Sequence, residues 1–116
     1  MIELIDSSLI IETEKFIKSL KIEDILFLKA DGCYCEINMV TKEKILIPNT
    51  LKEIQGYLLD KHFCRCHKSF LLNMQYFKEL KKSNKEKILI LKDNTTIPVS
   101  QGKLQSFKDC LKRNCM

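Results

Sequence analysis

Short apolar stretches separated by polar ones run along the whole chain, at the spacing of β-strands. The densest is Ile25-Leu26-Phe27-Leu28, bounded by Glu23-Asp24 and Asp31-Gly32, which is typical of a buried strand. The polar residues 41–44 between two such stretches predict a hairpin. No βαβ alternation is visible, so we expect antiparallel sheets. Strands are predicted at residues 8–11, 15–21, 25–28, 33–40, 45–47, 63–66, 69–73, 76–80, 88–91 and 96–99.

A short central helix is predicted after this hairpin. Thr50 followed three residues later by Glu53 fits a capping box, in which each side chain bonds the other residue's backbone N–H. We expect this helix to end near Lys61 or His62. Its apolar residues fall on one helical face: Leu51, Ile54 and Leu58.

A second helix is predicted at the C-terminal end. Ser100 occupies the position of an N-cap, and apolar residues recur at helical spacing behind it. Asp93-Asn94, between the last two strands, suits the left-handed backbone of a tight turn. The apolar stripe of this helix consists of Leu104, Phe107 and Leu111.

Length and composition indicate one soluble domain spanning residues 1–116. The chain is 45% hydrophobic and 30% charged, and it lacks the run of about 20 apolar residues that a membrane helix needs. No basic segment precedes an apolar one at the N-terminus, so we expect no signal peptide and a cytoplasmic location. The six cysteines are then expected to be reduced thiols rather than a disulfide framework.

Charge divides the chain into two halves. Residues 1–60 carry seven Lys against eleven acids, and residues 61–116 carry thirteen Lys or Arg against four acids. Either the second half is an ordinary solvated surface, or it presents a basic face to a polyanion. The chain shows no phosphate loop and no paired nucleophile and base, so we predict that it is not an enzyme and needs no cofactor.

Four segments, taken in order, resemble the LytTR DNA-binding domain. The first is 22–34, an apolar strand followed by Ala30-Asp31-Gly32-Cys33-Tyr34, and the second is the short helix at 50–54. The most specific is Phe63-Cys64-Arg65-Cys66-His67-Lys68-Ser69, followed by an apolar triplet and Asn73. The last is Ile97-Pro98-Val99-Ser100. The resemblance covers residues 15–112.

The resemblance implies an elongated stack of antiparallel β-sheets whose loops enter neighbouring major grooves of double-stranded DNA. It implies sequence-specific DNA binding and transcriptional regulation, by a free-standing protein or by the excised output domain of a response regulator in a two-component system. We expect binding at paired DNA sites, with a homodimer on the DNA. We also expect an upstream histidine kinase or another sensor protein as a partner. We expect no membrane partner.

The resemblance also assigns residues to the DNA interface. Lys68 lies where the family presents a side chain to guanine or phosphate, although it could be simply solvated. Tyr34 would stack on a sugar or a thymine methyl unless it packs in the core, and Cys35 replaces it if the register is off by one. Gln101 stands where the family often has Arg; it could read adenine without supplying charge, which Lys103 would add.

Several polar residues leave alternatives open. Arg65 lies two residues before His67 on the same predicted strand, so the two side chains should share a face. The Arg65 guanidinium suits a phosphate or an internal carboxylate equally. His67 and Asn73 are expected mainly to tie loop backbone to strand, with DNA contact as the lesser alternative for His67. Around one hairpin the lysines either bind phosphate or are solvated: Lys78, Lys81, Lys82, Lys85 and Lys87.

The two Cys-x-Cys pairs support a second hypothesis, a thiol- or metal-based sensor or interaction module that does not bind DNA. Cys64 and Cys66 lie near two histidines, as in some zinc sites. On a strand, however, such a pair places its thiols on one face about 7 Å apart, and zinc motifs more often use a turn. We therefore expect buried structural thiols and no metal, with a redox switch as the remaining alternative.

Overall fold

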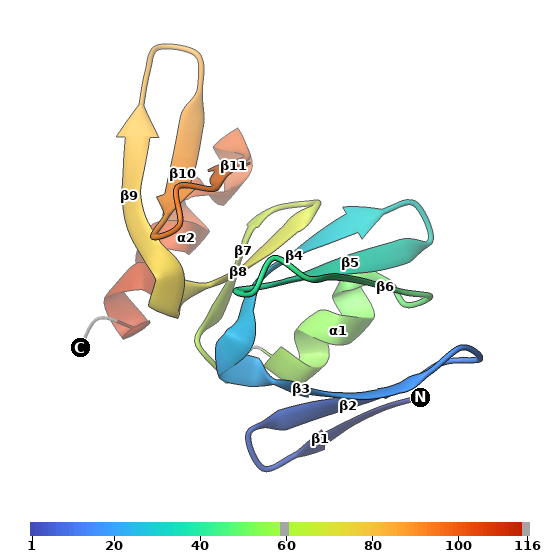
Figure 1. Ribbon diagram of the computed structural model, residues 1–116. Helices are drawn as coiled ribbons and strands as arrows, with labels where there is room; N and C mark the ends of the chain where they lie inside the picture. Colours follow the sequence, from blue (N-terminus) through green and yellow to red (C-terminus); the bar gives the residue numbers. More distant parts are fainter. Residues whose placement is uncertain (59–60, 115–116) are drawn as a thin grey trace.

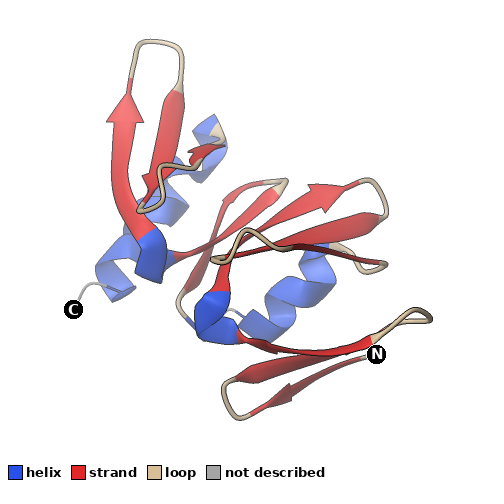
Figure 2. Cartoon of the chain, viewed as in Figure 1, coloured by secondary structure: helices blue, strands red, loops and turns tan. Residues whose placement is uncertain are grey.

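The computed structural model describes residues 1–58 and 61–114 and confirms the predicted mainly β architecture, with three antiparallel sheets and two α-helices (Figures 1 and 2). The N-terminal sheet has the order β1-β2-β3, the central sheet β6-β5-β4-β8-β7 and the C-terminal sheet β11-β10-β9. The molecule is elongated, with extents of 45 × 32 × 24 Å. The strands are β1 (Ile2–Ile5), β2 (Ser8–Glu12), β3 (Ile17–Lys21), β4 (Ile25–Asp31), β5 (Tyr34–Met39), β6 (Lys44–Ile47), β7 (Phe63–His67), β8 (Phe70–Asn73), β9 (Phe77–Lys82), β10 (Lys87–Leu91) and β11 (Thr96–Pro98).

The first helix, α1 (Leu51–Leu58), lies between the N-terminal and central sheets (Figure 1). The predicted capping box is present: Glu53 N–H donates to Thr50 Oγ1 over 3.2 Å, and Thr50 N–H donates to the Glu53 carboxylate over 3.4 Å. The predicted end of this helix, near Lys61 or His62, borders residues 59–60, which lie outside the described part of the chain.

One hydrophobic core surrounds α1. Strands β2 and β4 contribute side chains such as Leu9 and Leu28, which are fully buried against the helix residue Ile54. Strand β2 alternates buried and more exposed positions, as a strand with one covered face should. This core, called core one below, joins the N-terminal sheet to one face of the central sheet.

A second core, core two, lies between the other face of the central sheet, the C-terminal sheet and α2 (Leu104–Asn114). Phe107 of α2 packs edge-on against Phe77, with ring centroids 5.4 Å apart. Ser100 precedes a 3-10 turn, η4 (Gln101–Lys103), rather than α2 itself. Contrary to expectation, its hydroxyl makes no capping bond within the described residues. Its backbone carbonyl instead accepts from Lys103 N–H.

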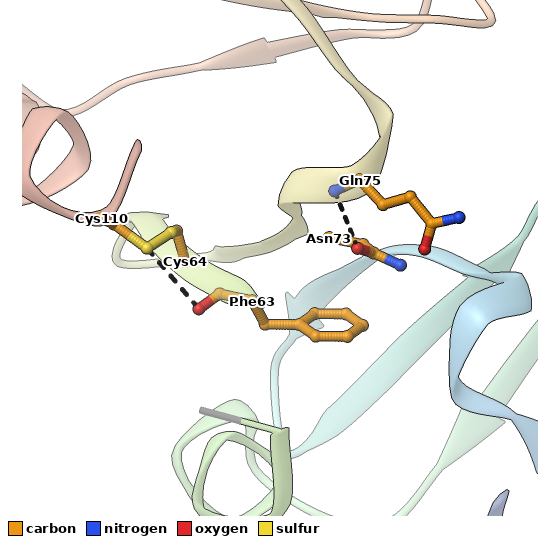
Figure 3. Close-up of a disulfide and its surroundings, with 5 residues drawn as sticks. All are labelled: Phe63, Cys64, Asn73, Gln75 and Cys110. Atoms are coloured by element: carbon orange, nitrogen blue, oxygen red, sulfur yellow. Dashed lines mark hydrogen bonds between the residues drawn. A yellow bond between two sulfur atoms is a disulfide. The ribbon is translucent and has the colours of Figure 1, made fainter. Parts of the chain in front are cut away.

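A disulfide between Cys64 of β7 and Cys110 of α2 crosses core two (Figure 3). The prediction that all thiols are reduced was therefore wrong for this pair. The two residues are 46 positions apart in sequence and meet only because α2 packs on β7. The Cys110 sulfur also lies 3.8 Å from the carbonyl oxygen of Phe63.

Two further predictions need correction. Residues 2–5 form β1, which was not predicted as a strand; its backbone pairs with β2 from Ile2↔Ile11 to Ile5↔Ser8. Cys33 lies in the turn between β4 and β5 and is exposed, whereas Cys35 is buried. This first Cys-x-Cys pair therefore does not share a strand face.

Candidate nucleic-acid interface

The turn between β7 and β8 presents Lys68 to solvent. His67, at the end of β7, accepts a hydrogen bond at Nδ1 from the Ser69 N–H over 3.0 Å. Its ring lies edge-on to Phe70, with centroids 5.6 Å apart. One imidazole nitrogen and one ring edge are thus used to shape the turn that carries Lys68.

Arg65 does not share a face with His67, contrary to the sequence interpretation. Arg65 pairs with Leu71, and His67 pairs with Phe70, with a register shift between them. Neighbouring residues of β8 point to opposite faces, so Arg65 and His67 do too. Arg65 Nε donates to the His67 carbonyl over 2.9 Å, and Nη2 donates to the Lys68 carbonyl. Burial lowers the pKa of the Arg65 guanidinium.

Two other segments lie against this turn. Ala30 N–H, at the end of β4, donates to the Ser69 carbonyl over 2.8 Å, which places the β4–β5 turn beside it. On the other side, Ser100 N–H donates to the Cys66 carbonyl over 3.1 Å, which places η4 beside the end of β7. Residues 31–34, 67–69 and 101–103 therefore form one continuous edge, called the loop edge below.

The loop edge exposes four of the residues that the sequence assigned to DNA contact: Tyr34, Lys68, Gln101 and Lys103. Tyr34 is 48% exposed, which removes the core-packing alternative for its ring. Lys29 of β4 was not predicted; its Nζ lies 6.0 Å above the ring of Phe70, its cross-strand partner. Lys29 lies beside the Lys68 turn because β4 pairs with β8, and this pairing cannot be read from residues near Lys29 in the sequence. Asp31, the last residue of β4, is exposed beside the β4–β5 turn.

Cys35 is not part of the loop edge. Its side chain is fully buried in core one, so it cannot replace Tyr34 as a DNA contact in this conformation. Burial raises the pKa of the Cys35 thiol to about 12, and that of the Cys66 thiol to about 12 as well. Both groups are therefore neutral thiols at ordinary pH.

Asn73 lies at the far end of β8 from the Lys68 turn, about 10 Å along the strand at the usual rise per residue. Its side chain is 2% exposed. Nδ2 donates to the Ile25 carbonyl over 2.9 Å, and Oδ1 accepts from Gln75 N–H over 3.0 Å. Figure 3 shows the second of these bonds. This amide joins β8 to the start of β4 and to the turn that follows.

The hairpin of β9 and β10 projects away from the central sheet (Figure 1). Lys82 pairs with Lys87 across it, and Lys81 pairs with Ile88. Because strand residues alternate between faces, Lys81 and Lys82 point to opposite sides of the hairpin. Two lysines directly opposite each other are unfavourable without a counter-ion.

Within the part of the chain described, no three or more His, Cys, Asp or Glu side chains are grouped so as to hold a metal ion. None of the helices described there is both long and apolar enough to cross a bilayer.

The fold is β-rich, and polar and basic side chains are exposed on the loops along one of its edges, a surface of the kind that can meet nucleic acid. A family model, described as the LytTr DNA-binding domain, matches residues 15–112. The chain belongs to this family of DNA-binding domains.

Two relatives are similar to part of this chain. The transcriptional regulatory protein YpdB of Escherichia coli (strain K12) is 33% identical over 72 residues, 60% of this chain and 30% of that protein. The sensory transduction protein LytT of Bacillus subtilis (strain 168) is 38% identical over 66 residues, 56% of this chain and 27% of that protein. The chain thus spans less than a third of the length of these relatives.

The fold matches the LytTr DNA-binding domain of a putative methyl-accepting/DNA response regulator from Bacillus cereus. The TM-score is 0.75 at 24% identity, and the match covers 91% of this chain and 97% of that one.

Proposed function

We propose that this chain binds double-stranded DNA in a sequence-dependent way through the loop edge, and that it regulates transcription from the bound site. The observation that carries the proposal is the alignment of three turns by two backbone hydrogen bonds, Ala30 to Ser69 and Ser100 to Cys66. Membership of a DNA-binding family supplies the ligand class.

The side chains of the loop edge suit distinct tasks. Lys68 is exposed and would bond guanine or phosphate, and Lys103 would add a second positive charge. Gln101 can form a two-point contact with adenine. Tyr34 offers an exposed ring and hydroxyl to a sugar or a thymine methyl. His67 shapes the turn and has one nitrogen left for a contact.

On a body with extents of 45 × 32 × 24 Å, we place the turns of the loop edge in neighbouring stretches of major groove. Paired sites near one helical turn apart would hold two copies as a dimer on DNA. The relatives named for regulation and sensory transduction support an upstream sensor, such as a histidine kinase, and a cytoplasmic location.

The test starts with selection from a randomised duplex pool, repeated at two salt concentrations. We expect enrichment of paired short sites, with an affinity that falls as salt rises. Lys68→Ala should then weaken binding to the enriched duplex roughly 10- to 100-fold, the worth of one good base or phosphate contact.

The matched control is Lys21→Ala, which removes the same charge beyond the opposite end of β4, about 20 Å from the turn. Its affinity should equal that of the wild type. Equal losses in both variants would reduce the interaction to general charge, and an unchanged Lys68→Ala would exclude the loop edge as the contact surface.

The disulfide keeps a second candidate open, a thiol-based sensor. If that function is the main one, the fraction of the Cys64–Cys110 pair that is oxidised should change with the activity of the protein, and the wild type should bind no DNA even at low salt. Quantitative alkylation with mass spectrometry, combined with the binding assay, separates the two candidates.

A further inference from the structure

Arg65 is committed to hydrogen bonds within the chain. Nε and Nη2 donate to the carbonyl groups of His67 and Lys68, and Nη1 donates to Oε1 of Gln55 in α1. Each of the three guanidinium nitrogens thus has a partner, and two of the partners are consecutive backbone groups of the turn. A planar fork with fixed donor directions can meet such a set, whereas a single ammonium cannot.

A β-bulge in β7 directly precedes the two carbonyl groups to which Arg65 donates. Between the pairs Arg65↔Leu71 and His67↔Phe70, one extra residue, Cys66, interrupts the ladder. Backbone oxygens that leave a ladder near the protein interior must find other donors. The Cys66 carbonyl accepts from Ser100, and the next two accept from Arg65.

We propose that Arg65 is a positioning residue for DNA recognition: through its bonds to the His67 and Lys68 carbonyls and to Gln55, it holds the 67–69 turn in the shape that presents Lys68, and it does not contact DNA. The inference rests on the proposed function, because it concerns how the loop edge reads its site.

The bond to Gln55 extends this arrangement to the scaffold. Gln55 lies in the second half of α1, whose apolar face is fixed in core one. The turn is therefore held by a helix anchored in core one as well as by its own strands. A turn held before binding loses less conformational freedom when the complex forms, which raises affinity for the matching site.

Positioning and phosphate contact predict different salt dependences. Loss of a phosphate contact lowers the slope of log affinity against log salt by about one, and it weakens specific and non-specific binding alike. Loss of a positioning residue leaves the slope unchanged and removes preference for the enriched site. The slope and the ratio of specific to non-specific affinity are thus the deciding measurements.

The experiment compares Arg65→Gln, Arg65→Lys and Gln55→Ala with the wild type on the enriched duplex and on a scrambled duplex of equal length. For Arg65→Gln we expect a loss of at least tenfold on the enriched duplex, little change on the scrambled one, and the wild-type slope. Arg65→Lys should lose nearly as much, because it keeps the charge but not the fork. Gln55→Ala should show a smaller loss of the same kind.

Arg113→Gln, at the other arginine of the chain, is the charge-matched control and should retain the wild-type preference. The double variant Arg65→Gln with Lys68→Ala should bind little worse than Lys68→Ala alone, because Arg65 acts through the turn. Amide exchange at Ser69 and Ala30 should accelerate in Arg65→Gln while exchange in β2 and β3 stays slow. Urea unfolding of each variant establishes that binding is measured on folded protein, and Gln55→Ala covers the case in which Arg65→Gln does not fold.

The outcomes separate this inference from the proposed function. A wild type that enriches no site overturns both. A wild type that enriches a site, with Arg65→Gln keeping the preference for it, overturns the positioning role alone. A salt slope reduced by about one in Arg65→Gln, with full rescue by Arg65→Lys, would show instead that Arg65 binds phosphate.

Discussion

The two hydrophobic cores lie on opposite faces of the same central sheet but are held together differently. Core one joins β1–β3 and α1 to that sheet through apolar packing, with residues such as Leu9, Ile37 and Ile54 fully buried. Core two joins the C-terminal sheet and α2 to the other face, and a disulfide crosses it. Strand β7 serves both, because Phe63 faces core one and Cys64 faces core two.

Charge follows the same division. The net positive charge of the second half of the sequence belongs to the segments that build core two and two of the three turns of the loop edge. A region that concentrates like charge is destabilised by self-repulsion, and a covalent link between β7 and α2 counteracts this. Core one is thus held by apolar packing, and core two is the cross-linked region built from the more basic half of the chain.

The largest expected decrease in the free energy of unfolding comes from removing one large aromatic side chain from either core. Phe63 and Phe107 are matched probes, since both are essentially fully buried, one in each core. Each change to Ala should lower the free energy of unfolding by about 3 to 5 kcal/mol, from lost burial and the cavity left behind. Urea unfolding followed by circular dichroism measures both. Exposed Ile17→Ala is the control, and two separate transitions in either variant would mean that the cores unfold independently.

Loss of the disulfide, which lies in core two, should cause the next largest decrease in the free energy of unfolding. Closing a loop of this length restricts the unfolded chain, and loss of the Cys64–Cys110 link should cost about 2 to 4 kcal/mol. The measurement is the urea midpoint of the wild type with and without dithiothreitol. Cys110→Ala should be insensitive to the reductant; a wild type equally insensitive would show that the link contributes nothing.

Each core contains one buried thiol, so the stability of both cores should depend on pH. Burial raises the pKa of Cys35, in core one, and of Cys66, in core two, from 9.0 to about 12. Unfolded thiols ionise first as pH rises, so stability is complete below about pH 9 and falls between about 9 and 12. The loss should be about 1 kcal/mol per thiol from pH 9 to 10. Cys35→Ala and Cys66→Ala should each remove one thiol's part of this loss.

Features that depend on near neighbours in sequence could be predicted, and features that depend on pairing could not. The capping box at Thr50 and the left-handed turn residue Asn94 involve residues at most a few positions apart. Strand β1 becomes a strand only by pairing with β2, and a disulfide across 46 residues requires the packing of α2 on β7.

The loop edge shows the same limit at the level of single residues. The motif pointed to Tyr34, Lys68, Gln101 and Lys103, all of which are exposed on it. Strict alternation along 63–67 placed Arg65 beside His67, but one inserted residue reverses the faces after Arg65. A bulge of this kind carries no compositional mark, so Arg65 was assigned as a phosphate ligand or an ion-pair partner rather than as a donor to the turn.

The smallest expected effect contrasts how the two helices begin. Thr50 and Glu53 satisfy each other's backbone N–H groups at the start of α1, so Thr50→Ala should cost about 1 kcal/mol. Ser100 offers only its backbone, so Ser100→Ala should change stability by no more than about 0.3 kcal/mol. Urea unfolding of both variants under identical conditions is the measurement. Equal losses would mean that the Ser100 hydroxyl caps η4 in solution, as the Thr50 hydroxyl caps α1.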